Sequence, residues 1–338
     1  MSDTQSPRAN LHPPHGWIVL DKPRGLGSTQ AVAAVKRNLR EAGYPKTRIG
    51  HGGTLDPLAE GVLPIALGDA TKLAGRLLDA SKAYEFTVQF GTETDTLDGE
   101  GTVAAQSDHR PPFAAISAVL EHFTGRIEQV PPAFSALKVD GRRAYDRARA
   151  GEAVELAPRM VTIHALSLAG RGLREPVDSA FASIAGRPDP FDPQAPLELA
   201  DAVTLVAEVS KGTYIRSLAR DIARALGTVG HVTWLRRTRA GPFREEQAIS
   251  LDKLNAIGKG ARLEDVILPL EAGLDGIPAL NLESEAVQAV RQGRVLSGLP
   301  QSDGLYCAMA GKIPVALLEI TSGTARVVRG FNIPDTAE

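Results

Sequence analysis

Apolar residues in this chain occur only in short runs, and this most limits what the sequence can fold into. Trp17-Ile18-Val19-Leu20 has the length and composition of a buried strand, and no run reaches the roughly 18 residues of a membrane-spanning helix. Further helix-like and strand-like segments follow it, at residues 28–43 (helix), 84–90 (strand), 110–125 (helix), 161–168 (strand), 203–209 (strand) and 215–226 (helix). The pattern predicts an α/β or α+β protein without membrane spans.

Length, cysteine content and the N-terminal residues narrow the possible class of protein further. At roughly 100–200 residues per domain, 338 residues predict two domains. The single cysteine, Cys307, excludes an internal disulfide and a multi-cysteine metal site. Residues 1–16 are polar and lack the apolar core of a signal peptide, so we expect a flexible tail and a cytoplasmic protein.

Changes in composition suggest where the domains lie. Residues 170–200 contain five prolines and little periodicity, which is typical of a surface insertion. After about residue 275 the chain turns to short apolar runs separated by Gly and Pro, which predict a small β domain over 275–335. The main domain is then expected over 17–272.

Positive charge is concentrated in two stretches although the whole chain carries −2. Residues 22–48 hold seven Lys or Arg against one acid, a local charge of 7 − 1 = +6, and residues 211–244 hold eight against one, 8 − 1 = +7. On a shared face the two stretches would attract a polyanion such as nucleic acid. The alternative is two solvated helix faces whose charges are balanced by residues elsewhere in the sequence.

The segment from Gly50 to Gly61 is the strongest candidate for chemistry. Three glycines surround His51 and permit close backbone approach, and Asp56 precedes Pro57, which favours an extended loop. A carboxylate presented on such a loop is a candidate reactive group, although an isolated Asp-Pro is more often a structural turn. No Walker A, dinucleotide-binding, His-Glu-x-x-His or Gly-x-Ser-x-Gly motif occurs.

A second candidate lies where a predicted strand meets a helix, at Lys211-Gly212-Thr213-Tyr214-Ile215-Arg216. Arg216 could pair with a carboxylate and keep it ionised, and an exposed Tyr214 could stack on a base. The alternative is a buried tyrosine and a surface arginine without a functional role.

Taken together and in order, these motifs resemble the bacterial tRNA pseudouridine-55 synthases, the TruB family. The resemblance rests on blocks spread over residues 16–245: Gly16–Pro23, Gly50–Ala59, Ser81–Tyr84, Thr92–Asp98, Pro131–Lys138 with Gly141, Lys211–Arg216 and Leu235–Arg237. Each block alone is weak evidence, whereas the collinear set is specific.

The resemblance implies an isomerase without cofactor or metal. It would cleave the N-glycosidic bond of a uridine in the tRNA T loop, rotate the uracil and rejoin it through carbon. Asp56 would be the catalytic nucleophile, with Tyr84 and Arg216 as further catalytic residues. The partner would be the T arm of tRNA, bound by a monomer.

The same resemblance assigns binding roles. His51 would take the place of the extruded base, and Tyr84, Tyr214 and Leu235 would line the uracil pocket. The RNA backbone would lie on four cations: Lys22, Lys138, Arg236 and Arg237.

The fold implied by the resemblance is a catalytic domain with a mixed, largely antiparallel central sheet and a cleft, followed by a small PUA-like RNA-binding β-barrel. Two positions depart from the family motif, because Gly52 and Glu60 stand where threonine is common. Gly52 could loosen the loop that carries His51.

Two other functions remain open on the sequence. The chain could be a catalytically silent RNA-binding protein on the same scaffold. It could also be a glycoside hydrolase, which needs a second carboxylate such as Asp95 or Asp98 facing the first.

Overall fold

The computed structural model describes residues 11–139, 141–169 and 198–333. Most of the expected tail (1–16) and nearly all of the expected insertion (170–200) lie outside these residues. The chain divides into two compact units, the first formed by residues 1–57, 61–79 and 239–338 and the second by residues 58–60 and 80–238. The expected boundary between residues 272 and 275 stays a prediction.

The first unit is built on the predicted N-terminal strand. β1 (Gly16–Lys22) pairs antiparallel with β3 (Glu60–Leu67), and β2 (Ile49–His51) also pairs antiparallel with β3. Trp17 is fully buried, its indole Nε1 donates to the carbonyl of Leu270 at 3.0 Å, and its ring lies 5.1 Å from that of Phe243. This burial confirms the expected core strand.

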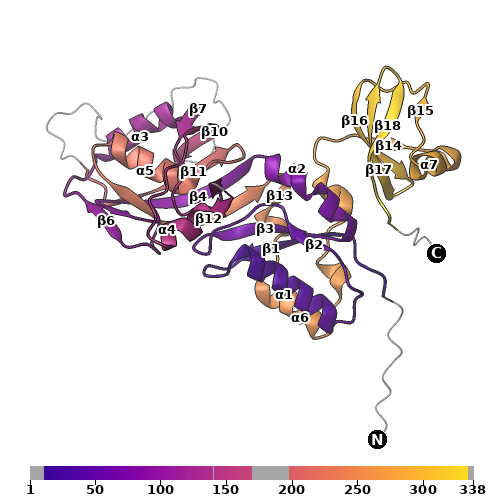
Figure 1. Cartoon of the computed structure of the whole chain (residues 1–338), viewed down its shortest axis with the longest axis horizontal. Coiled ribbons are helices and arrows are strands. Elements are labelled where there is room, and N and C mark those ends of the chain that lie inside the picture. The colour runs from indigo at the N-terminus through magenta and orange to yellow at the C-terminus, as the bar shows by residue number, and fades with distance from the viewer. Residues whose placement is uncertain (1–10, 140, 170–197, 334–338) are drawn as a thin grey trace, which may run out of the picture. The chain divides into compact units, whose positions relative to one another are not determined.

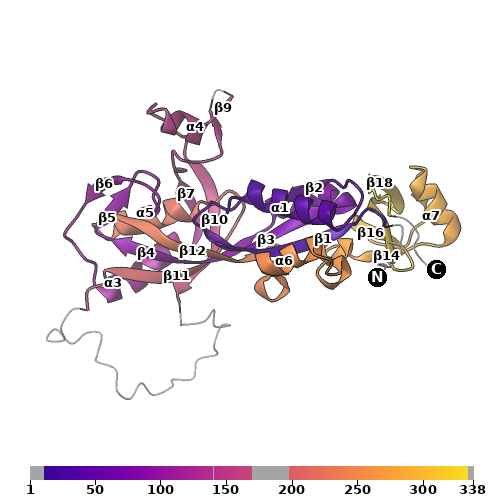
Figure 2. The same cartoon turned by 90° about the horizontal axis from the view of Figure 1, so that it is seen from below.

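Helices α1 (Ser28–Glu41) and α6 (Leu251–Gly258) lie side by side in this unit (Figures 1 and 2). The Asn38 amide donates to Asn255 Oδ1 at 3.0 Å between them. The helix predicted over 28–43 is confirmed, with Gly43 past its end at φ +87°. Gly27 is its N-cap residue, and the Gly27 N–H donates to Gln30 Oε1 at 2.8 Å.

The second unit contains a run of neighbouring strands that includes the three predicted ones. Their order is β12 (Gly230–Ala240), β4 (Lys82–Phe90), β11 (Ala202–Val209), β10 (Arg159–Leu168) and β7 (Gly125–Gln129). The β4–β11, β11–β10 and β10–β7 pairs are antiparallel, as expected for this fold class.

One of the two helices predicted in the second unit is shorter than the sequence suggested. The helix expected over 110–125 is α3 (Phe113–Val119) followed by a 3₁₀ turn at Leu120–Phe123, because Gly125, at φ +95°, begins β7. The helix expected over 215–226 is α5 (Ile215–Ala225) and agrees closely.

Smaller elements complete both units. The first unit also holds α2 (Ala74–Asp79) and β13 (Phe243–Arg244). The second holds two hairpins, β5 (Thr92–Thr94) with β6 (Val103–Gln106), and β8 (Lys138–Val139) with β9 (Arg142–Arg143), the latter leading into α4 (Ala144–Arg149). Figure 2 shows α4 and β9 projecting beyond the sheet strands of their unit.

The C-terminal β region expected from the sequence is present as a five-stranded sheet. Its order is β14 (Ala279–Asn281), β16 (Gly304–Ala310), β17 (Ile313–Thr321), β18 (Thr324–Gly330) and β15 (Leu296–Ser297), with α7 (Ser284–Arg291) packed against it. β14 and β16 run parallel and the other pairs antiparallel.

Burial raises the pKa of the Cys307 thiol to about 11, which keeps it protonated and unreactive near neutral pH.

Within the described ranges, no helix has both the length and the apolar character needed to cross a membrane.

Candidate functional site

The loop that carries Asp56 is held on both sides of this residue by the turn between β1 and α1. Before it, the Ser28 hydroxyl donates to the carbonyl of Leu55 at 2.9 Å and accepts the Leu55 N–H at 2.8 Å. After it, the carbonyl of Pro57 accepts the N–H of Gly25 at 2.8 Å. Asp56 itself is half-buried. The backbone at Asp56 is therefore positioned by its neighbours, as a reacting carboxylate requires.

Lys22 is a third anchor of this loop. Its side chain is fully buried, and its ammonium donates to the carbonyls of Leu26 at 2.6 Å, Pro23 at 3.0 Å and Pro57 at 3.3 Å. A buried ammonium with three acceptors has its donors engaged. The expectation that Lys22 contacts the RNA backbone is corrected accordingly, because no part of its side chain reaches the surface.

We expect Ser28→Ala to lower the free energy of unfolding by about 2 kcal/mol, because both backbone groups of Leu55 lose their buried partner. Turnover at saturating tRNA should fall roughly 10-fold, since a small displacement of a reacting group is costly. The matched control is Thr29→Ala, whose side chain is exposed. Equal losses in both variants, measured by urea denaturation and turnover, would mean that Ser28 acts only through helix α1.

The departure at Gly52 is explained by packing. A Cβ at this position would lie 2.5 Å from Leu77 Cδ1 and 3.0 Å from Leu77 Cβ. Leu77 is buried in the core of the first unit. The side chain of α2 therefore fills the space that a threonine at position 52 would need. The neighbouring His51 is half-buried, and its Nδ1 accepts the Gly53 N–H at 3.4 Å.

Restoring the threonine should therefore destabilise this protein. We expect Gly52→Thr to cost about 2 kcal/mol of unfolding free energy through overpacking against Leu77. In the double variant with Leu77→Ala, the total loss should be smaller than the sum of the two single losses, because the contact is shared. Additive losses in urea denaturation of the four proteins would show that the two positions do not interact.

Arg216 is buried near the start of α5. Its guanidinium donates to the carbonyl of Thr96 at 2.7 Å and to that of Phe134 at 3.0 Å, and lies 3.5 Å from Asp98 Oδ2. Both charged side chains are about 5% exposed. The arginine therefore ties together two of the sequence blocks, Thr92–Asp98 and Pro131–Lys138.

The two acids proposed as a second glycosidase carboxylate are engaged within their own loop. Asp98 Oδ1 accepts the Thr96 hydroxyl at 2.6 Å and the Glu100 N–H at 3.0 Å, in addition to its ion pair with Arg216. Asp95 accepts the N–H and the hydroxyl of Thr102, both at 2.9 Å. These contacts give both acids a role in shaping the loop.

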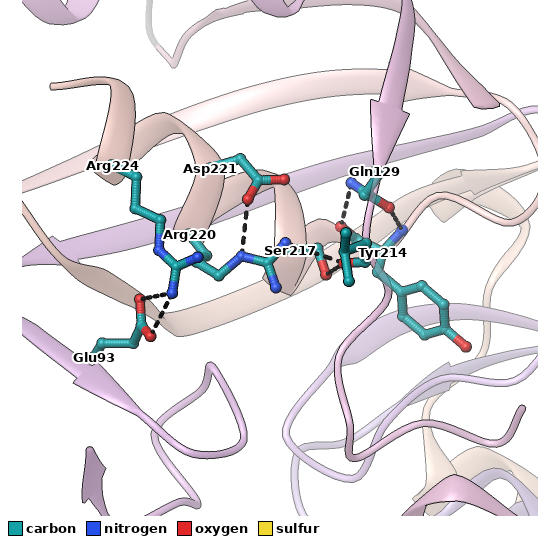
Figure 3. A network of polar contacts seen from close by, with 8 residues as sticks. Glu93, Gln129, Tyr214, Ser217, Arg220, Asp221 and Arg224 are labelled. Carbon is teal, nitrogen blue, oxygen red and sulfur yellow. Dashed lines mark hydrogen bonds and ion pairs between the residues drawn. The ribbon is translucent and has the colours of Figure 1, made fainter. Parts of the chain in front are cut away.

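Tyr214 is held at the start of α5 by two residues that the sequence did not single out. The Gln129 amide accepts the Tyr214 N–H at 2.8 Å and donates to its carbonyl at 3.2 Å, and the ring points away from this clamp (Figure 3). The Arg159 guanidinium lies 4.8 Å from the centre of the Tyr214 ring and donates to the carbonyl of Gly212. Tyr214 is half-buried.

Tyr84 and Leu235 occupy neighbouring strands of this unit. Tyr84 is half-buried on β4, on the same face as the buried Phe86 and Val88 by strand alternation. Leu235, on β12, is 4% exposed.

Most cations of the 211–244 stretch are used inside the second unit. Arg220 pairs with Asp221 at 2.8 Å, and Arg224 pairs with Glu93 at 2.9 Å (Figure 3). Arg237 is 1% exposed, which corrects its expected contact with an RNA backbone. For this stretch the alternative of internally balanced charge holds better.

The second departure from the family motif, Glu60, pairs with another cation of this stretch. Glu60 Oε1 accepts the indole N–H of Trp234 at 3.2 Å and lies 3.4 Å from Arg236 Nη1. Lys138, the last of the expected backbone contacts, is exposed on β8.

The candidate residues thus fall into two groups. His51 and Asp56 belong to the first unit, and Tyr84, Tyr214, Arg216 and Leu235 belong to the second. Within the described residues, no group of three or more His, Cys, Asp or Glu could hold a metal ion.

Comparison with known proteins identifies the family. Residues 40–181 match the family model described as the TruB family pseudouridylate synthase (N terminal domain), and residues 216–275 match the tRNA pseudouridylate synthase B C-terminal domain. The tRNA pseudouridine synthase B of Novosphingobium aromaticivorans is 65% identical over 323 residues, covering 96% of this chain and 99% of that one. The enzyme of the same name from Zymomonas mobilis is 53% identical, covering 98% and 100%.

Two solved structures agree with this family assignment. A chain in the structure of an H/ACA RNP bound to a substrate RNA containing 2′-deoxyuridine has a TM-score of 0.64 and 26% identity, covering 95% of this chain and 86% of that one. A chain in a Cbf5-Nop10-Gar1 complex has a TM-score of 0.61 and 29% identity, covering 90% and 78%. This chain therefore belongs to the TruB family and is a tRNA pseudouridine synthase, an isomerase that makes pseudouridine in tRNA.

Proposed function

We propose that the chain isomerises one uridine of the tRNA T loop, uridine 55, with Asp56 as the catalytic nucleophile. The observation that carries this proposal is the fixation of the Asp56 loop by Ser28, Gly25 and Lys22. Four hydrogen bonds from the segment between β1 and α1 fix the backbone on both sides of Asp56, which is the positioning that a reacting carboxylate needs.

The reaction requires one bond exchange on the uridine. The N1–C1′ bond breaks, the uracil rotates, and C5 bonds to C1′. The C5 hydrogen leaves as a proton, and N1 gains one, so that the product is an isomer of the substrate. A carboxylate at Asp56 serves this exchange because it can add to the electron-poor centre that bond cleavage creates.

The target base must first leave the stack, because its reacting atoms are shielded there. In our proposal the half-buried Tyr84 and Tyr214 contact the extruded uracil, Leu235 closes its pocket, and His51 takes the place of the base in the RNA. The clamp of Gln129 on Tyr214 supports this assignment, since it fixes the backbone from which the ring extends.

Arg216 remains our candidate for the charge that keeps Asp56 ionised. Its carbonyl contacts with Thr96 and Phe134 support a fixed guanidinium. Lys138 remains our candidate for a contact with the RNA backbone. It is exposed, and it lies beside Arg142 and Arg143 on the β8–β9 hairpin, whose strand β9 projects beyond the sheet (Figure 2). The C-terminal sheet would act as the PUA-like RNA-binding module over residues 275–335.

The test is a pair of unmodified tRNA transcripts that differ only at the proposed target, uridine or cytidine. We expect the wild-type protein to form one pseudouridine in the first transcript and none in the second. Pseudouridine at another position in both would contradict the T-loop assignment, and release of free uracil would favour a hydrolase.

A further inference from the structure

Helix α1 and the segment after it enclose a cavity of about 480 Å³ in the first unit, which we call the α1 pocket. Its apolar lining includes Ala33, Leu39, Pro45 and Ile49. A cavity of this size falls in the range of small-molecule sites, roughly 300–1,000 Å³. None of these residues has a role in the proposed reaction.

Four cations line the same pocket: Lys36, Arg37, Arg40 and Lys46. All four are exposed, and no acidic side chain lines the pocket with them. Among the described residues none of the four forms an ion pair, although Arg37 donates to Asn255 Oδ1 at 3.1 Å. A cation in the last turn of α1 is expected for Arg40 from the helix dipole, but this does not account for Lys36.

This arrangement differs from that of the 211–244 stretch, where arginines have carboxylate partners. Uncompensated positive charges repel each other and raise the local potential. An anion between them would relieve this repulsion, and the polyanion already established for this protein is tRNA.

Tyr44 adds an aromatic ring to the pocket lining. It is half-buried, its N–H donates to the carbonyl of Leu39 at 3.0 Å, and its hydroxyl donates to Glu264 Oε1 at 3.4 Å. Burial and the Glu264 carboxylate raise the pKa of the Tyr44 phenol, so the side chain stays neutral beside a phosphate. Proteins recognise unstacked bases with such aromatic platforms next to cations.

We propose that the α1 pocket binds an unstacked nucleotide of the tRNA other than the target uridine. The base would lie against Tyr44 and the apolar lining, and flanking phosphates would contact Lys36, Arg40 and their neighbours. Arg40 lies 12 residues along α1 from Ser28, which contacts the Asp56 loop, and this corresponds to about 18 Å. A nucleotide held at the Arg40 end of the pocket is therefore distinct from the one that reacts. The inference rests on tRNA being the substrate.

The phosphate part is tested with Lys36→Gln/Arg40→Gln and a labelled unmodified tRNA transcript. We expect the dissociation constant to rise roughly 10-fold or more at moderate salt, and the slope of log affinity against log salt to fall by about 1.5, for two lost phosphate contacts. The control, Lys253→Gln, removes an exposed charge on α6 of the same unit and should leave both quantities unchanged.

The base part is tested with Tyr44→Leu and Tyr44→Phe. Tyr44→Leu should weaken tRNA binding roughly 10-fold without changing the salt slope, because stacking involves no counterion release. Tyr44→Phe should bind like the wild type, since it keeps the ring. Binding that falls only in the charge variant would overturn the nucleotide pocket and leave a simple cationic surface.

Pseudouridine formation at saturating protein separates this inference from the proposed function. We expect all pocket variants to reach the wild-type single-turnover rate, because the pocket lies outside the reacting groups. Wild-type binding in both Lys36→Gln/Arg40→Gln and Tyr44→Leu would refute the inference while leaving the activity intact. A wild-type protein that makes no pseudouridine at the T-loop uridine would instead refute the proposed function.

Discussion

Replacing Asp56 by asparagine should abolish turnover while leaving tRNA binding nearly intact. Asparagine has nearly the same shape, and the hydrogen bonds of Leu55 and Pro57 hold the loop on both sides of position 56. The backbone should therefore keep its place. A neutral amide cannot add to an electron-poor carbon as a carboxylate does.

The expected loss of rate is about 10⁴-fold or more, the scale seen when a reacting group is removed from an enzyme. The rate can be followed as tritium release from tRNA that carries 5-³H-uridine, since the C5 hydrogen leaves during the reaction. Filter binding gives the affinity in parallel. A variant that retains a tenth of the wild-type rate would exclude Asp56 as the nucleophile.

Replacing Lys22 by methionine should produce the largest loss of stability. Methionine keeps much of the volume of the side chain but removes three hydrogen bonds, so the carbonyls of Pro23, Leu26 and Pro57 lose a buried donor. With about 1 kcal/mol or more for each unsatisfied group, we expect the free energy of unfolding to fall by about 3 kcal/mol.

The matched control is Lys253→Met, an exposed lysine on α6, which should change the unfolding free energy by no more than about 0.5 kcal/mol. Both are measured by urea denaturation. Lys22→Met should also slow turnover, because Pro57 follows Asp56 directly. If Lys22→Met instead were as stable as wild type but bound tRNA weakly, Lys22 would be an RNA contact after all.

The sequence predicted several strands and helices with strong apolar patterns, but it missed the apolar strand β3 and the strand β12, in which polar residues are buried. β1, β4, β10, β11 and α5 follow from their apolar spacing. β12 was interpreted as part of a cationic stretch, because Arg236, Arg237 and Arg239 dominate its composition. Burial of Arg237 among strands depends on long-range packing, which periodicity cannot reveal.

The same limit applies to individual site residues. The motif around Asp56 was visible because glycines and an Asp-Pro pair are unusual in sequence. The sequence predicted Lys22 as a surface charge. Its structural role depends on a hydrogen bond to Pro57, which lies 35 residues further along the chain. Serine is a common residue at helix N-termini, yet the Ser28 hydroxyl forms a tertiary hydrogen bond with Leu55 instead. No sequence motif pointed to Gln129.

The most direct test of the central claim compares tRNA treated with wild-type protein and with Asp56→Asn. Carbodiimide adducts mark pseudouridine, and reverse transcription stops at them. We predict a single stop in the T loop for the wild type and none for Asp56→Asn, with equal tRNA binding by both. A T-loop stop of equal intensity with Asp56→Asn would contradict the assignment of Asp56 as the reacting carboxylate.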